Sequence, residues 1–251
     1  MFKIFLNGST GRMGQAISAA VASDPDLVIE ASGDLEHHGF EGLSACDVAI
    51  DFSNHAATLP LAQQCAAHHL PLVIGTTGHL NSERHLLEAL GSRIPIVWAG
   101  NYSIGVNLLL YLVENAARIL PSSYQIELFE AHHQHKVDAP SGTAENLLST
   151  ILAARNLDHS QLRHGRHGIT GARTSEEIGV HSLRAADIVG EHTVWFAGSG
   201  ERLELTHRAT DRSIFALGAL QAAKWLLEAT PSPGIYSMRE VLGLTSSTPE
   251  Q

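Results

Sequence analysis

A glycine-rich turn at residues 8–14 constrains the fold of this chain more than any other feature. It lies between a short apolar run at residues 2–6 and a segment of helical period, in which Met13, Ile17 and Val21 fall on one face. Glycines between a strand and a helix let the backbone turn tightly and approach a pyrophosphate at the helix N-terminus. The spacing is GxxGxxG rather than the commoner GxGxxG, so a plain strand-to-helix turn remains an alternative.

The first part of the chain alternates apolar runs with segments of helical period, a pattern typical of βαβ units and a parallel sheet. The expected strands are at residues 2–6, 28–31, 48–52, 72–74 and 94–98, and the helices between them include 55–69 and 82–90. Asn81 is expected to cap the second of these helices, and Gly91 to end it. The sequence therefore predicts a doubly wound α/β domain.

The pattern changes after about residue 104. Helices are expected at residues 105–118 and 143–155, and extended runs at 125–130, 179–184, 191–197 and 202–209. Gly198-Ser199-Gly200 gives the last two runs hairpin spacing, which indicates an antiparallel or mixed sheet. Residues 163–175 are expected to form an exposed loop, and residues 213–229 an apolar helix that could pack back on the first domain.

The net charge and cysteine content argue against several classes of protein. A formal net charge of -10 and a pI near 5.8 oppose binding to a nucleic-acid backbone, which requires clustered Lys and Arg. Cys46 and Cys65 have no metal-type spacing, and a disulfide framework is not expected in a chain of 251 residues. Nothing in the sequence has the pattern of a membrane span or an export signal. We therefore expect a cytoplasmic protein without nucleic-acid or membrane partners.

Polar and glycine-rich turns follow other strands of the expected sheet. Asp34 lies about twenty residues beyond the glycine loop, where a carboxylate can accept hydrogen bonds from the ribose hydroxyls of a dinucleotide. The turns Gly75-Thr76-Thr77-Gly78 and Ala99-Gly100-Asn101-Tyr102 follow the next two strands. Because open α/β sheets bind ligands outside the carboxyl ends of their strands, both turns could line the nicotinamide half of one cleft. Turns without any ligand role are the alternative in each case.

Residues 130–144 combine histidines, a lysine and a helix start. In one interpretation, His132, His133 and His135 bind a metal such as zinc, which favours imidazole nitrogen. Lys136 opposes this, because it places a cation beside the supposed dication, and we expect no metal. In a second interpretation, the loop binds an anionic substrate while a histidine and the lysine move protons. A solvated polar loop is the third alternative.

The end of this stretch, Pro140-Ser141-Gly142-Thr143, is typical of a helix N-terminus. A glycine there leaves backbone N–H groups open to a carboxylate or phosphate. Several cations and hydrogen-bond donors beside a dinucleotide cleft suit a small dicarboxylate, which is the substrate class that the residues favour.

Several motifs in order along the chain resemble those of the 4-hydroxy-tetrahydrodipicolinate reductase family, also called dihydrodipicolinate reductases. They are GRMG in the glycine loop, DFS at residues 51–53, GTTG at 75–78, NYSIGVN at 101–107, EAHHQHKVDAPSGTA at 130–144 and DIVGEHTVWF at 187–196. The resemblance runs from residue 1 to about residue 244. The motif at 130–144 is long and specific, far beyond what a glycine loop alone could support.

This resemblance implies a fold and an activity. Residues 1–103 and 213–251 would form a Rossmann-like dinucleotide-binding domain, and residues 104–212 an inserted α+β mixed-sheet domain that binds substrate and builds a homotetramer. Members of the family reduce 4-hydroxy-tetrahydrodipicolinate to tetrahydrodipicolinate with NADH or NADPH, in lysine and diaminopimelate biosynthesis. Another Rossmann dehydrogenase, or a dinucleotide-sensing or metal-storing protein, is the alternative.

The resemblance also assigns roles to residues. His132 would donate or accept a proton, Lys136 would donate one, His133 would bind substrate, and Gly142 and Thr143 would hold a carboxylate. The residues expected at the coenzyme are Gly8, Ser9, Thr10, Gly11, Arg12, Met13, Asp34, Gly75, Thr76, Thr77, Ala99, Gly100, Asn101 and Tyr102.

One position departs from the pattern of the family and bears on the choice of coenzyme. Some members place an arginine directly after the acidic ribose-binding residue, where it can pair with a 2′-phosphate, whereas this chain has Leu35 after Asp34. Arg12 remains a candidate partner for such a phosphate. We therefore expect NADH to be used at least as well as NADPH.

Overall fold

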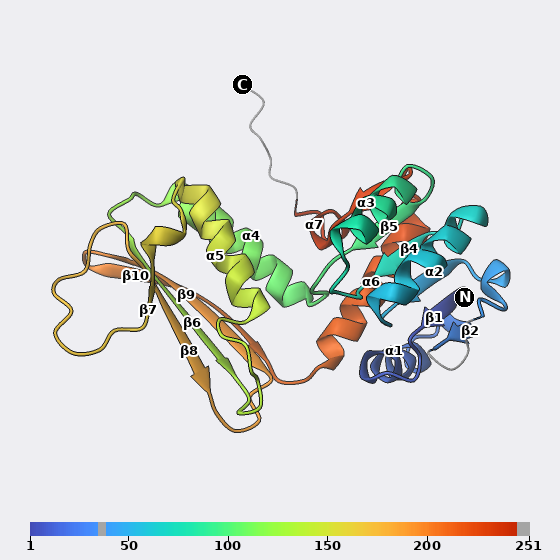
Figure 1. The fold of residues 1–251 in the computed structure, drawn as a ribbon, viewed down its shortest axis with the longest axis horizontal. Helices are drawn as coiled ribbons and strands as arrows, with labels where there is room; N and C mark the ends of the chain where they lie inside the picture. The colour runs from blue at the N-terminus through green and yellow to red at the C-terminus, as the bar shows by residue number, and fades with distance from the viewer. Residues whose placement is uncertain (35–38, 245–251) are drawn as a thin grey trace. The chain divides into compact units, whose positions relative to one another are not determined.

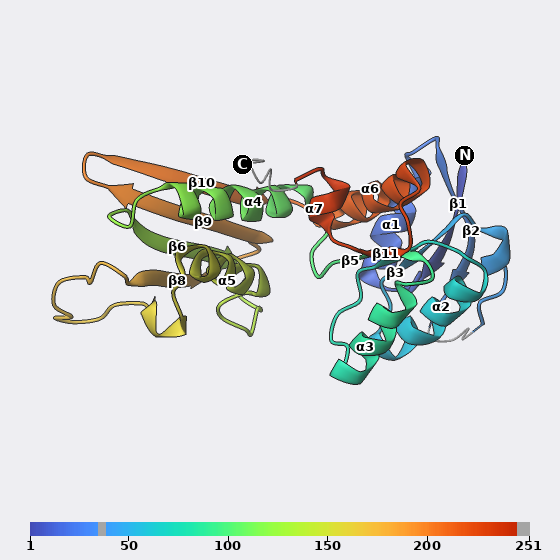
Figure 2. The same cartoon turned by 90° about the horizontal axis from the view of Figure 1, so that it is seen from above.

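A computed structural model describes residues 1–34 and 39–244 of the chain. The chain folds into two compact units, which Figures 1 and 2 show from two sides. The first unit consists of Met1–Ile104 and Arg212–Gln251, and the second is Gly105–Asp211. The N-terminal unit is thus made of two segments that are distant in sequence, with the second unit inserted between them.

The N-terminal unit is built on a six-stranded sheet whose strands are all parallel, in the order β11-β5-β4-β3-β1-β2. Its strands are β1 (Phe2–Asn7), β2 (Leu27–Gly33), β3 (Val48–Asp51), β4 (Leu72–Ile74), β5 (Pro95–Trp98) and β11 (Gly234–Tyr236). Its helices are α1 (Arg12–Ala22), α2 (His55–Ala67), α3 (Asn81–Leu90), α6 (Ser213–Ala229) and α7 (Met238–Val241). The chain passes from β1 to β2 on one side and then returns to place β3 on the other side, so the order reverses between β1 and β3.

Both faces of this sheet are covered by helices, as Figure 2 shows: α1 and α6 lie on one face, and α2 and α3 on the other. Successive side chains of a strand therefore enter different cores. Along β1, Ile4 and Leu6 pack with α1 and α6, whereas Phe5 packs on the opposite face. Along β3, Ile50 packs on the face covered by α1 and α6, and Ala49 packs on the opposite face. Burial on both faces explains why these strands are continuous apolar runs rather than alternating ones.

Helix α6 follows the inserted unit in sequence and packs against the first helix of the N-terminal unit. At Gly218 the helix lies against the backbone of Tyr102, and a Cβ atom there would lie 1.7 Å from the carbonyl oxygen of Tyr102. A larger residue could not be accommodated there without moving the helix. The position of α6 therefore depends on a glycine inside a helix, where propensity alone would favour alanine.

The inserted unit contains a five-stranded mixed sheet in the order β10-β9-β6-β8-β7. Its strands are β6 (Gln125–His132), β7 (Leu162–His164), β8 (Ile178–Arg184), β9 (Gly190–Gly198) and β10 (Glu201–Ala209), and its helices are α4 (Ile104–Ile119) and α5 (Gly142–Arg155). Strands β9 and β10 form the hairpin that the glycines predicted. The two helices pack on one face of this sheet (Figure 1), around a core that includes Leu128, Leu148 and Phe196.

Residues 163–175 are mostly exposed, as predicted, but ion pairs anchor them to the sheet. Arg166 and Arg173 both donate hydrogen bonds to the Glu127 carboxylate on β6, and His181 also contacts it. Burial raises the pKa of Glu127, but the hydrogen bonds from Arg166, His181 and Arg173 outweigh this effect and lower it to about 2. The loop is thus fastened by charge rather than by apolar packing.

The structure confirms the predicted α/β class, with a parallel Rossmann-like sheet and a separate mixed sheet. Strands β7 and β11 were not predicted, and β7 includes residues 163 and 164 of the stretch expected to be a loop. Helix α3 begins at Asn81 after Leu80 instead of being capped by Asn81. Cys46 and Cys65 are buried free thiols. Among the described residues, no helix is both long and apolar enough to span a membrane.

Candidate active site

A cavity of about 530 Å³ opens at the carboxyl ends of β1, β2 and β3. Its walls include Gly8, Asp34 and Phe52. This is the point where the strand order reverses, and in doubly wound sheets the crevice at that point is where ligands bind. The volume lies within the range of about 300–1,000 Å³ that small-molecule and cofactor sites occupy. The cavity has the size and place of a site for part of a dinucleotide.

The glycine loop leaves no room for side chains at two of its positions. Gly8 has a φ of 82°, and a Cβ atom there would lie 2.5 Å from the carbonyl oxygen of Phe52. A Cβ atom on Gly14 would lie 2.2 Å from the carbonyl oxygen of Gly8. Gly11 precedes α1 as its N-cap, with no side-chain capping bond in the described structure. The first turn of α1 therefore has the backbone geometry that binds phosphate at helix N-termini.

A buried carboxylate fixes the ends of the strands around this cavity. Asp51 is fully buried at the end of β3. Its Oδ1 accepts hydrogen bonds from Asn7 Nδ2 at 2.8 Å and from Ser53 Oγ at 2.5 Å, and its Oδ2 accepts one from Thr58 Oγ1 at 2.6 Å. Ser53 N in turn donates to Thr76 Oγ1 at 3.0 Å. Asp51 thus joins the ends of β1 and β3 to α2 and, through Ser53, to the turn after β4.

The two further turns predicted at the coenzyme lie beside each other. A Cβ atom on Gly100 would be 4.0 Å from Thr77 Cγ2, which places the turn after β5 next to the turn after β4. Tyr102 is buried, and its hydroxyl donates to the carbonyl oxygens of Ile74 at 2.8 Å and Val97 at 3.0 Å. Its phenol is therefore engaged with the protein backbone and holds the turn after β5 against β4 and β5.

The structure distributes the predicted coenzyme residues between the cavity and the neighbouring turns. Gly8, Thr10, Gly11 and Asp34 line the cavity. The remaining predicted residues lie outside its lining, namely Ser9, Arg12, Met13, Gly75, Thr76, Thr77, Ala99, Gly100, Asn101 and Tyr102. Leu35, on which the coenzyme prediction also depends, lies outside the residues that the structure describes.

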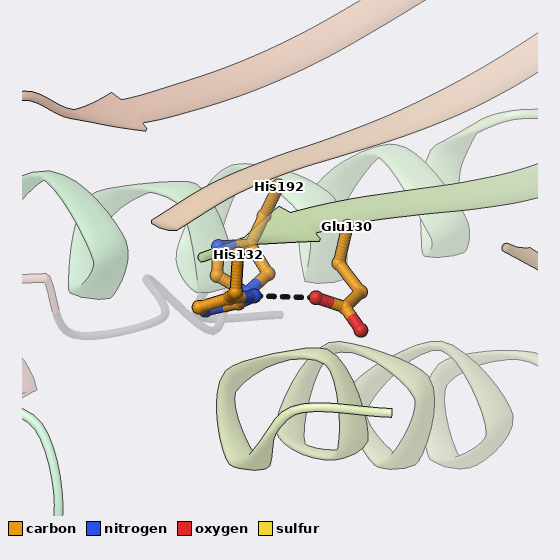
Figure 3. Close-up of side chains that lie close together, drawn as sticks. All are labelled: Glu130, His132 and His192. Atoms are coloured by element: carbon orange, nitrogen blue, oxygen red, sulfur yellow. Dashed lines mark hydrogen bonds and ion pairs between the residues drawn. The ribbon is translucent and has the colours of Figure 1, made fainter. Parts of the chain in front are cut away.

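A second polar cluster lies in the inserted unit, at the end of β6 (Figure 3). Glu130 and His132 are two residues apart on the strand, so their side chains share one face. His132 Nδ1 is 2.5 Å from Oε2 of the buried Glu130 carboxylate. Arg184 lies on the neighbouring strand β8, opposite His132 in the strand pairing. It donates to Glu130 Oε1 at 2.8 Å and to Oε2 at 3.0 Å. Burial raises the pKa of Glu130, but the hydrogen bonds from Arg184 and others lower it on balance, so the group is ionised.

His192 on β9 stands against the ring of His132, with the two centroids 5.2 Å apart. Ser141 Oγ accepts a hydrogen bond from Ala144 N at the start of α5 and forms a second hydrogen bond with His192 Nε2 at 2.9 Å. Burial, and next the charge of His132, lower the pKa of His192 to about 4. His192 is therefore a neutral imidazole that orients the cap of α5.

The other predicted residues of the loop lie around this cluster. Lys136 Nζ forms an ion pair with Asp138, at 2.8 Å from both carboxylate oxygens, and its charge contributes to a lowering of the His132 pKa that is caused chiefly by burial. His133 Nδ1 is buried without a hydrogen-bond partner among the described residues. A Cβ atom on Gly142 would have nothing within 4 Å, so the space beside the first residue of α5 is open.

The geometry does not gather the three loop histidines around one point. Within the described part of the chain, the group with metal-type spacing is Glu130, His132 and His192, whose ligand atoms lie within 4.8 Å of one another. Both oxygens of Glu130 already accept hydrogen bonds from Arg184, and a guanidinium beside the carboxylate opposes a second cation. The arrangement therefore disfavours a metal ion at this group.

The sequence prediction gave no role to four polar residues that organise these two sites: Asp51, Glu130, Arg184 and His192. Asp51, Glu130 and His192 lie inside the quoted motifs, yet their partners are distant in sequence. Glu130 and Arg184, for example, are 54 residues apart. The pairing of β6 with β8 brings them together, and no local pattern shows that pairing.

Comparisons with known proteins bear on both units. Residues 2–102 match the family model of the dihydrodipicolinate reductase N-terminus, and residues 105–242 match that of its C-terminus. The chain belongs to the dihydrodipicolinate reductase family. The predicted family and the oxidoreductase class are thereby confirmed, and the N-terminal unit is the dinucleotide-binding domain of such a reductase.

Similar proteins extend over nearly the whole chain. A 4-hydroxy-tetrahydrodipicolinate reductase of Akkermansia muciniphila is 50% identical over 247 residues, which cover 98% of this chain and 99% of the relative. A 4-hydroxy-tetrahydrodipicolinate reductase of Thiobacillus denitrificans is 42% identical over 265 residues, which cover 96% of this chain and 98% of the relative. A dipicolinate-bound dihydrodipicolinate reductase from Paenisporosarcina sp. TG-14 has a TM-score of 0.78 at 23% identity, covering 96% of this chain and 98% of that one, and shows the shared fold.

The low pKa of His192 predicts how the stability of the reductase depends on pH. The folded pKa is about 4, below the usual value of about 6.5 in an unfolded chain. The unfolded state therefore binds the proton more readily, and the free energy of unfolding falls as pH falls from about 6.5 to about 4, by about 3 kcal/mol at most from this group.

His192→Gln removes this titration while keeping a side chain that can form a hydrogen bond with Ser141. We expect its stability to fall less than that of the wild type over the same pH range, measured by denaturant unfolding at several pH values. His135→Gln, which changes an exposed histidine in the loop after β6, is the control and should follow the wild type. Identical pH dependence in His192→Gln and the wild type would contradict the assignment.

Proposed function

We propose that this chain reduces 4-hydroxy-tetrahydrodipicolinate to tetrahydrodipicolinate, with loss of water, in lysine and diaminopimelate biosynthesis. The observation that carries the proposal is the 50% identity to a reductase of that name over 98% of the chain, with matches to both halves of the family. NADH or NADPH would serve as the hydride donor. A cytoplasmic location and a homotetramer belong to the same proposal.

The N-terminal unit would hold the coenzyme. The glycine loop and the first turn of α1 suit the pyrophosphate, because amides without a side-chain cap are available there in the described structure. Asp34 on the wall of the cavity suits the adenosine ribose. The adjacent turns at residues 75–77 and 99–102 would face the nicotinamide. A bound nicotinamide would supply the hydride, and the residues of the protein would align it.

His132 and Lys136 would manage the protons. His132 is bonded through Nδ1 to the buried Glu130 carboxylate, which holds its ring in place. Lys136 is paired with Asp138, whose side chain is 55% exposed, and such an ion pair is worth only about 0–1 kcal/mol. Lys136 can therefore exchange the Asp138 carboxylate for an anionic substrate at little cost.

The carboxylates of the substrate would be held by the start of α5 and by His133. The helix N-terminus carries partial positive charge, and the space beside Gly142 is open. Gly142 and Thr143 are the first residues of the helix. The dipicolinate in the structure of the Paenisporosarcina reductase is a ligand of the same class, a small dicarboxylate.

The assay that tests the activity makes the substrate in situ from pyruvate and aspartate semialdehyde and follows the loss of NADH or NADPH absorbance. Absence of turnover with either coenzyme would overturn the proposal. A dinucleotide sensor would bind NADH without oxidising it in the presence of substrate. A metal-storing protein would purify with stoichiometric metal.

His132→Ala and Lys136→Ala should each lower kcat strongly, because a positioned acid or base contributes about a hundredfold to ten-thousandfold. Coenzyme affinity should change little. Lys136→Ala should also raise KM for the substrate, since it removes a positive charge from an anion site. Steady-state kinetics with His135→Ala as the matched control checks this. A variant that keeps nearly wild-type turnover does not have the assigned role.

Gly142→Val should raise KM for the substrate while leaving thermal stability almost unchanged. The new side chain would meet no protein atom near its Cβ, so it would occupy the space proposed for the carboxylate. Substrate titrations and thermal unfolding of the same preparation separate the two effects. Unchanged KM in the folded variant would exclude this end of α5 as the carboxylate site.

NADH should be used at least as well as NADPH. Asp34 can accept hydrogen bonds from both ribose hydroxyls but would repel a 2′-phosphate, and Leu35 supplies no compensating cation. Leu35→Arg should shift the preference toward NADPH, by a charge-assisted contact of roughly 1.5 to 3 kcal/mol at best. The ratio of kcat/KM for the two coenzymes measures this, and a strong preference of the wild type for NADPH would refute the argument.

A further inference from the structure

The surroundings of His132 define which of its ring nitrogens can meet a substrate. Nδ1 is 2.5 Å from Glu130 Oε2, and the Glu130 side chain is fully buried. Nε2 points toward β9, where a Cβ atom on Gly190 would lie only 3.1 Å from it. A glycine at that position therefore avoids a close contact between a side chain and the nitrogen that does not bond Glu130.

Arg184 holds the carboxylate in this orientation. Its guanidinium donates to both oxygens of Glu130 and also donates from Nη2 to the carbonyl oxygen of Asp138, at 2.6 Å. A planar guanidinium that binds both carboxylate oxygens fixes the plane of the carboxylate as well as its position. The carboxylate cannot rotate away from His132 without losing these bonds.

We infer that Glu130, clamped by Arg184, is a positioning residue that keeps the proton of neutral His132 on Nδ1 and presents Nε2 as the atom that transfers protons. The inference rests on the proposed role of His132 and adds to it the identity of the reacting atom. An ionised carboxylate accepts hydrogen bonds and cannot donate them, so its neighbour Nδ1 must carry the proton. The carboxylate also stabilises the imidazolium that forms whenever Nε2 takes up a proton.

The charged groups around His132 decide the direction of a pH effect. Glu130 on β6 favours the imidazolium, whereas Lys136 in the loop and Arg184 on β8 oppose it. His192 on β9 packs against the ring of His132, and Asp138 is paired with Lys136. Removing the charge of Glu130 leaves Arg184 without its counter-charge, whereas Lys136 keeps its ion pair with Asp138. The pKa of His132 must then fall, and any limb of the pH profile that His132 controls must move to lower pH, whether His132 acts as acid or as base.

Glu130→Gln is the variant that tests the inference. It keeps the size of the side chain and an oxygen acceptor but removes the charge. We expect kcat at neutral pH to fall about tenfold to a hundredfold, the His132 limb to move down by about one pH unit, and KM for the coenzyme to stay unchanged. A limb that stays in place in a folded Glu130→Gln enzyme would overturn the inference.

Glu127→Gln is the matched control. Glu127 lies on the same strand, is also clamped by arginines and contacts a histidine, but it lies on the opposite face and its partners are Arg166, Arg173 and His181. The control should lose stability to a similar extent without moving the pH limb. An equal shift in both variants would show a general electrostatic effect and would contradict a specific role of Glu130.

The tautomer can be measured in the wild-type protein, so the test does not depend on the folding of a variant. ¹⁵N-histidine labelling gives separate resonances for Nδ1 and Nε2, and the spectrum of His132→Ala assigns them. We expect a protonated Nδ1 and an unprotonated Nε2 at neutral pH. A proton on Nε2 would overturn the inference even if His132 is catalytic, whereas an active His132→Ala would overturn the proposed function and leave the tautomer to be judged by its spectrum.

Discussion

Among the residues that the structure describes, each sheet buries one carboxylate near the carboxyl end of a strand that has neighbouring strands on both sides. Asp51 on β3 is 0% exposed and Glu130 on β6 is 1% exposed. A buried carboxylate is costly unless donors surround it, and these donors come from neighbouring strands, helices and turns. Satisfying the two groups therefore fixes the ends of several elements at once, and both proposed binding regions are built from those ends.

The two carboxylates have different donors, and this difference matches different tasks. Asp51 accepts from an amide and two hydroxyl groups, which fix geometry without adding a counter-charge. Glu130 accepts from Arg184 and contacts His132, so its charge state and that of the imidazole depend on each other. The Asp51 network is suited to shaping the coenzyme cavity. The Glu130 network is suited to controlling a proton.

Local sequence patterns were sufficient to predict the elements that have a clear hydrophobic periodicity or a clear turn motif. They were not sufficient to predict the elements that depend on partners distant in sequence. The glycine loop, the buried parallel strands and the β9–β10 hairpin were predicted because each has a signal within a few residues. Strand β11 has only three residues and exists because it pairs with β5, about 140 residues earlier. At α3, the backbone N–H of Leu80 is bonded by Glu83, so the helix begins without the Asn81 cap that propensity favoured.

The charge balance at the end of β6 explains why this cluster suits an anionic substrate. Glu130 and Arg184 cancel, as do Asp138 and Lys136, so a neutral His132 beside a neutral His192 leaves the cluster without net charge. A dicarboxylate that displaces Asp138 from Lys136 would add negative charge next to His132, and nearby negative charge raises the pKa of an imidazole. Because Glu130 already stabilises the imidazolium through Nδ1, the added proton would go to Nε2. Substrate binding would then charge His132, the group proposed to transfer a proton, and the same group would remain uncharged in the free enzyme.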